Sequence, residues 1–113
     1  MGQVKVTGRV SFGPDATPFG KATAYVSLLD VSRQDAPSRS VAKQVIKCVK
    51  KGKEIKFSLR GAIDDPTGMY VVSVHIDVDG DGEVSIGDYI TTGYYQVAAE
   101  GDSDIDVRVQ KVT

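Results

Sequence analysis

The sequence is poor in the residues that make cross-links, metal clusters and membrane spans. Cys48 is the only cysteine among the 113 residues, so neither an internal disulfide nor a thiolate metal cluster is possible. No stretch reaches the roughly 18 to 20 consecutive apolar residues of a membrane-spanning helix, and the N-terminal segment has no signal-peptide core. We therefore expect a soluble chain, either cytoplasmic or one that has lost a targeting segment.

Length and composition are those of one globular domain. A chain of 113 residues has room for one hydrophobic core, and 41% hydrophobic with 26% charged residues is typical of soluble proteins. We expect residues 1–113 to form a single domain.

Charge is unevenly distributed along the chain. The formal net charge is −1, yet the five acidic residues of segment 77–88 contribute −5, so the rest of the chain carries +4. Seven of the cations fall in one stretch: Lys43, Lys47, Lys50, Lys51, Lys53, Lys56 and Arg60. Such lysines are expected on the exposed faces of strands, where they also discourage edge-to-edge pairing between molecules. The alternative is that they bind the surface of an anionic partner.

Apolar residues alternate with polar ones along most of the chain, which is the period of half-buried β-strands. The pattern predicts about seven strands and no helix, at residues 4–12, 22–28, 41–50, 55–60, 69–78, 89–98 and 103–112. Lys51 and Gly52 are expected to form the tight turn of a hairpin. Seven short strands separated by turn signals predict an all-β fold, a β-sandwich of immunoglobulin-like shape.

Segment 77–88, DVDGDGEVSIGD, matches the ligand pattern of an EF-hand calcium loop. That pattern has oxygen ligands at positions 1, 3, 5, 7, 9 and 12 and a glycine at position 6, which here is Gly82. The predicted ligands are Asp77, Asp79, Asp81, Glu83, Ser85 and Asp88. Clustered carboxylates repel one another, and Ca²⁺ would remove that repulsion.

The surroundings of this loop depart from an EF-hand. Position 12 is Asp88 where glutamate is usual, which predicts weaker binding suited to an extracellular calcium level. The flanking sequences VVSVHI and YITTGYYQV are strand-like. The two helices that flank an EF-hand loop and move apart on calcium binding are therefore not expected here. The loop resembles that of dockerins without their following helix. We expect a structural calcium clip, and the alternative is an Asp/Gly-rich turn that binds nothing.

Two further sets of residues could form a site. His75 shares a strand face with Ser73 and Asp77, but same-face residues stand about 6.6 Å apart, too far for a catalytic triad. A structural histidine is therefore expected. The five tyrosines could form an aromatic platform that binds a sugar or a peptide, or they could simply pack in the core: Tyr25, Tyr70, Tyr89, Tyr94 and Tyr95. No nucleic-acid module is recognisable.

Several stretches resemble the YbaY/YscW family of bacterial lipoproteins, which includes type III secretion pilotins. They are AYVSLLDVSRQDAPSRSVAKQVIK, KEIKFSLR and MYVVSVHI, and they contain an Asp-x-Ser pattern at residues 30–32 and an Asp-Ala-Pro crossing at residues 35–37. The resemblance implies a β-sandwich outside the inner membrane, often lipid-anchored, with a binding or chaperone-like role. The chain departs from the family in having no lipid-acceptor cysteine near Met1 and in its longer acidic segment.

Together these observations predict a non-enzymatic, calcium-binding β-sandwich, periplasmic or extracellular rather than cytoplasmic. The alternative is a carbohydrate- or protein-binding module, or a pilotin-like chaperone, in which the acidic segment is only a turn. A hydrolase that uses His75 is a third hypothesis.

Overall fold

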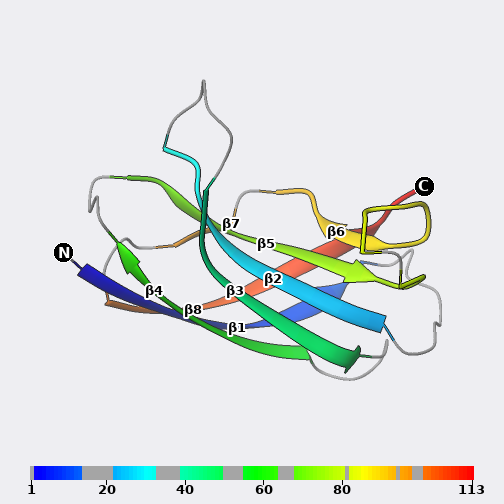
Figure 1. Cartoon of the computed structure of the whole chain (residues 1–113), viewed down its shortest axis with the longest axis horizontal. Helices are drawn as coiled ribbons and strands as arrows, with labels where there is room; N and C mark the ends of the chain where they lie inside the picture. The colour runs from blue at the N-terminus through cyan, green and yellow to red at the C-terminus, as the bar shows by residue number, and fades with distance from the viewer. Residues whose placement is uncertain are drawn as a thin grey trace.

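The structure is a computed structural model that describes residues 2–13, 22–32, 39–49, 55–63, 68–80, 82–93, 95–97 and 101–113. The described residues form eight strands and no helix (Figure 1). The strands are β1 (Gly2–Phe12), β2 (Ala22–Asp30), β3 (Arg39–Val49), β4 (Ile55–Ile63), β5 (Tyr70–Asp77), β6 (Tyr89–Thr91), β7 (Tyr95–Val97) and β8 (Gly101–Lys111). The all-β prediction is confirmed.

All eight strands belong to one strongly curled sheet. Its order is β3-β2-β5-β6-β8-β1-β4, with β7 paired to β5 outside this path. The pairs are antiparallel except for β1 and β8, which run parallel. The two end strands, β3 and β4, come into contact, and the Ser58 backbone N–H donates to the Gln44 Oε1 atom at 2.8 Å. The result is a nearly closed, barrel-like sheet.

The predicted division into two facing sheets is not confirmed. Strand β6 pairs with β5 through Tyr89 and Ile90, and all three of its residues pair with β8. This short strand therefore joins what would otherwise be two separate sheets. Period-two alternation reports which side chains are buried but not which strands pair. A barrel and a sandwich therefore produce the same sequence pattern.

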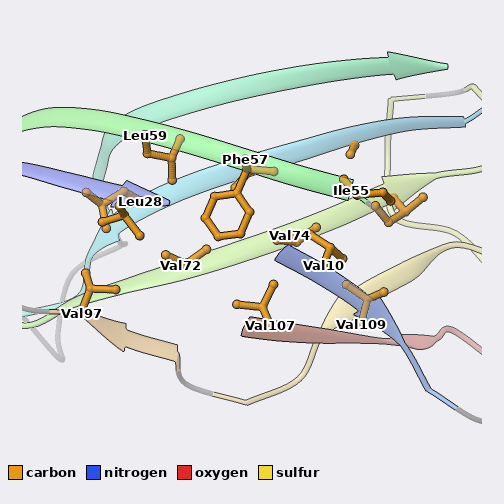
Figure 2. Packing of buried hydrophobic residues seen from close by; sticks show 14 of the residues in the cluster. Val10, Leu28, Ile55, Phe57, Leu59, Val72, Val74, Val97, Val107 and Val109 are labelled. Carbon is orange, nitrogen blue, oxygen red and sulfur yellow. The ribbon is translucent and has the colours of Figure 1, made fainter. Parts of the chain in front are cut away.

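The interior is filled by the inward side chains of nearly every strand, as the alternation predicted. Figure 2 shows the Phe57 ring at the centre, with Leu28, Leu59, Val72 and Val74 around it. Phe57 is opposite Gly8 in the register of β1 and β4. A Cβ atom on Gly8 would lie 2.2 Å from the Ile105 carbonyl oxygen and 2.6 Å from the Phe57 ring, so only glycine fits there.

Two details differ from the sequence-based expectation. Segment 89–98 forms two short strands that pair with opposite ends of β5, and the Thr91 Oγ1 atom accepts a hydrogen bond from the Val74 N–H between them. The hairpin predicted at Lys51 and Gly52 has its turn outside the described residues. The predicted hairpin pairing is not found in the described ranges: β3 pairs with β2, β4 pairs with β1, and no backbone ladder joins β3 to β4.

Candidate functional site

The segment predicted to bind calcium, residues 77–88, is called the acidic loop below. It connects the end of β5 to the start of β6 and lies near the C-terminus of the chain (Figure 1). Two backbone hydrogen bonds anchor it there, from Gly87 N–H to the Val112 oxygen at 2.9 Å and from Val112 N–H to the Asp88 oxygen at 2.8 Å. Asp81 lies outside the described residues.

Asp77 organises the first half of the acidic loop. Its side chain is buried, and it accepts hydrogen bonds from the N–H groups of Gly80 at 3.0 Å and Gly82 at 2.8 Å. Both glycines have a φ of 78°, a left-handed conformation that other residues rarely adopt. The glycines thus let the chain turn back around a carboxylate that terminates a core strand.

Asp88 organises the second half of the loop. It is 1% exposed, and its Oδ1 atom accepts a hydrogen bond from Val78 N–H at 2.9 Å. Its Oδ2 atom accepts from Ser85 N–H at 3.2 Å and lies 2.8 Å from His75 Nε2. The Ser85 hydroxyl donates to Asp79 at 2.7 Å and lies 3.3 Å from Asp88 Oδ2.

Three of the predicted ligands, Asp79, Ser85 and Asp88, are connected through the Ser85 hydroxyl, and a carboxylate oxygen of Asp77 lies within 4.8 Å of one of Asp88. Glu83 is exposed. Val84, a position usually apolar for packing, is 55% exposed instead. Since a carboxylate oxygen has two lone pairs, accepting a backbone N–H leaves room for a cation. The arrangement therefore suits either a calcium clip or a self-satisfied turn, and calcium binding stays a prediction.

His75 joins this loop, which the sequence reasoning missed. One ligand atom each from His75, Asp77 and Asp88 lies within 4.8 Å of the others. The hydrogen bond from His75 goes to Asp88, which precedes β6, and not along the strand to Ser73 or Asp77. The signal available in the sequence was the β5–β6 turn, which sets His75 opposite Ile90 and so close to residue 88.

The four described tyrosines, Tyr25, Tyr70, Tyr89 and Tyr95, do not form the aromatic platform considered from the sequence. Tyr70 and Tyr89 are buried in the core. The Tyr95 hydroxyl donates to the Arg108 carbonyl oxygen at 3.3 Å and accepts the Arg108 N–H at 3.0 Å. The Tyr25 ring stacks on His75 with ring centroids 5.7 Å apart, and the Lys43 ammonium stands 5.5 Å from the same ring. Tyr94 lies outside the described residues.

The Asp-x-Ser pattern at residues 30–32 has a structural role. The Asp30 carboxylate accepts hydrogen bonds from the Ser32 N–H at 3.0 Å and the Ser32 hydroxyl at 2.6 Å. The Ser32 oxygen in turn accepts the Met69 N–H at 2.8 Å, and Val31 N–H donates to the Met69 carbonyl at 3.0 Å. The motif therefore ties the end of β2 to the start of β5. The Asp-Ala-Pro crossing at residues 35–37 lies outside the described residues.

The fold and these contacts define an all-β scaffold, and the described residues contain no arrangement of side chains typical of a catalytic site. The sequence profile of the type III secretion system lipoprotein chaperones (YscW) matches residues 1–109, and the chain belongs to this family. A solved structure with the same fold, an alternative pilotin from the type II secretion system of Vibrio cholerae, is 25% identical over 98% of both chains, with a TM-score of 0.76.

Other comparisons add two findings. No curated protein matches the sequence significantly. In the described part of the chain, no helix has the length and hydropathy needed to cross a membrane.

Proposed function

We propose that this chain is a pilotin-like chaperone that binds a protein component of an envelope secretion system and catalyses no reaction. The observation that carries the proposal is the family match over residues 1–109, together with a pilotin structure that shares the fold along 98% of both chains. This function was the alternative to calcium binding in the sequence analysis. Because the family is described as lipoproteins, an envelope location follows from the same proposal.

The contacts of the one histidine agree with a binding role. A histidine acts as a general base through a ring nitrogen within reach of a nucleophile, and a bond from its other nitrogen to a carboxylate is compatible with that role. The Nε2 atom of His75 is engaged by Asp88, and its ring is stacked on Tyr25. Among the described residues, no hydroxyl group is hydrogen-bonded to His75, so these contacts place no nucleophile beside its ring.

The test is co-expression of this chain with each envelope subunit of the secretion system encoded in the same genome. One subunit is expected to become soluble and to purify with the chain in a defined complex. The matched control is a chain unfolded by Gly8→Val, since a client must be bound by the folded sheet. If every subunit behaves identically with and without the chain, the proposal is wrong.

Calcium uptake by the acidic loop is a second proposal, with Asp77, Asp79, Asp81, Glu83, Ser85 and Asp88 as ligands. The position of the Ser85 hydroxyl, 2.7 Å from an Asp79 oxygen and 3.3 Å from an Asp88 oxygen, favours it. The ion would act as a structural clip, since both flanks of the loop are strands.

The Asp79→Ala variant separates calcium binding from folding. Asp79 is exposed, so its loss should change the stability of chelator-stripped protein little, while removing one ligand. Millimolar calcium is expected to raise the melting temperature of the wild type, as mass action requires, and to raise it less in Asp79→Ala. No response in either protein would show that the loop is only a turn, and an equal rise in both would show that Asp79 is not a ligand, which contradicts the proposed set.

A further inference from the structure

The outer face of β4, β1 and β8 has an ordered arrangement of charges. The strand registers place these outward residues in three rows: Arg60, Lys5 and Asp102; Ser58, Thr7 and Asp104; Lys56, Arg9 and Asp106. Cations thus occupy β4 and β1, and aspartates line β8. Strands β1, β3 and β4 contain no acidic residue, so the acidic side chains of these three rows all come from β8.

The first of these rows is electrostatically unfavourable on its own. Lys5 and Arg60 are directly opposite each other in an antiparallel pair, and like charges in that relation destabilise a sheet. Asp102 is a neighbour of Lys5 in register, yet neither cation forms an ion pair with another described residue. Two cations facing one acid leave an excess positive charge that an anionic group would neutralise.

A concave pocket of about 740 Å³ lies at this row. Its lining includes Gln3, Lys5, Arg60, Ala62 and Asp102, and it is called the basic pocket below. The volume is within the range of ligand sites in proteins, about 300 to 1,000 Å³. Arg60 offers a planar fork that pairs with a carboxylate through two hydrogen bonds, and Gln3 adds an amide donor.

The aspartates select among anionic partners. Strands in a sheet are about 4.8 Å apart, so Asp102 stands next to Lys5 and Asp106 next to Arg9. A bilayer of anionic lipid or a nucleic acid would press negative charge onto those aspartates at the same time as it reached the cations. A polypeptide can place single carboxylates on the cations and keep other groups over β8.

We propose that the basic pocket binds a carboxylate-bearing segment of a protein partner, held by Lys5 and Arg60. The inference rests on the proposed client-binding function and names the surface and the chemistry of the client. The surrounding cations of β3 and β4 raise the rate of encounter, whereas the two pocket residues hold the bound segment.

The first experiment measures binding of a short fluorescent peptide in which glutamate alternates with serine, by anisotropy at low salt. The control peptide has glutamine in place of glutamate, and vesicles of phosphatidylglycerol form a separate arm. The test variant is Lys5→Gln with Arg60→Gln. The matched control is Lys43→Gln with Lys47→Gln, which removes the same charge from β3.

The acidic peptide should bind the wild type, and the pocket variant should bind at least about tenfold more weakly, whereas the β3 variant loses less than about threefold. Equal losses in the two variants would mean unspecific charge attraction and would overturn the inference. Absence of peptide binding, or tighter binding to vesicles than to the peptide, would overturn it as well.

The client complex distinguishes the two proposals. If the wild type forms no complex with any secretion-system subunit, the proposed function fails irrespective of the peptide result. If the complex forms and Lys5→Gln with Arg60→Gln leaves its affinity unchanged, the function stands and the basic pocket is not its surface.

Discussion

The acidic loop and the basic pocket are both clusters of like charge, but the molecule treats them in opposite ways. In the acidic loop the two buried carboxylates, Asp77 and Asp88, each accept hydrogen bonds from backbone N–H groups of the loop itself. In the basic pocket Lys5 and Arg60 face each other at the surface and form no ion pair with a described residue. One cluster is satisfied within the fold, and the other has capacity left for a partner.

This comparison shows that charge density in a sequence does not identify a binding surface. Segment 77–88 is the most conspicuous charge feature of the sequence, and most of its described contacts build a turn. Lys5 and Arg60 are 55 positions apart in the chain, and only strand pairing makes them neighbours. The difference between the two regions can be tested through stability, because only internally satisfied charges should matter for folding.

The largest effect is expected from Gly8→Ala, in the strand that bears the basic pocket. A new Cβ atom would meet the Ile105 carbonyl oxygen at 2.2 Å and the Phe57 ring, and backbone atoms cannot move aside cheaply. Overpacking of this kind should cost about 3 kcal/mol of unfolding free energy, measured by urea denaturation. Gly93→Ala is the control, since its nearest neighbour atom would be 4.0 Å away. Similar stability of the two variants would contradict the packing described for β1.

The second effect is expected from Asp88→Ala in the acidic loop. It would leave the N–H groups of Val78 and Ser85 and the ring of His75 without their acceptor. Because buried donors without partners are costly, the loss of unfolding free energy should be about 2 to 3 kcal/mol. Asp79→Ala, at an exposed position of the same loop, should cost less than about 1 kcal/mol. Thermal unfolding of both variants in chelator measures the difference, and equal costs would mean that Asp88 does not organise the loop.

A smaller effect is expected from Gly82→Ala. No atom would contact the new methyl group within 4 Å, but φ is 78°, so the cost is conformational and should be about 1 kcal/mol. The substitutions at Gly8 and Gly82 thus test two reasons why a position requires glycine: close approach of neighbouring atoms in the sheet, and a left-handed backbone conformation in the loop. A neutral Gly82→Ala variant would contradict the turn geometry assigned to the acidic loop.

The smallest effect on stability is expected from Lys5→Gln with Arg60→Gln. Removing two like charges that face each other should leave the melting temperature unchanged or raise it, by less than about 1 kcal/mol in free energy. Scanning calorimetry at low salt checks this, since salt screens the repulsion. A large loss of stability would show that the two cations stabilise the fold, as Asp88 does, and would contradict the difference drawn between the two regions.

Local patterns in the sequence predicted much of the fold but not its closure. Alternation located the strands and their buried faces, including Tyr70, Val72, Val74 and Ile76 of β5. It did not reveal that segment 89–98 splits into β6 and β7, because pairing with the two ends of β5 is a long-range property. Nor did it reveal that β6 joins β5 to β8, which makes a barrel-like sheet in place of a sandwich.

The candidate sites were predicted unevenly for the same reason. The contacts of Asp77 are with Gly80 and Gly82 nearby in the chain, so spacing alone indicated the turn. The bond from His75 to Asp88 depends on the turn into β6, and the pairing of Lys5 with Arg60 depends on the β1–β4 register. Contacts between distant strands leave no periodic trace in a single sequence.

Calorimetric titration of the purified chain with the secretion-system subunit that purifies with it measures the proposed client binding itself. We expect a saturable one-to-one complex that weakens with added salt and with Lys5→Gln and Arg60→Gln, but not with Asp79→Ala. A chain that binds none of the envelope subunits, while its melting temperature shows that it is folded, would contradict the assignment of a pilotin-like chaperone.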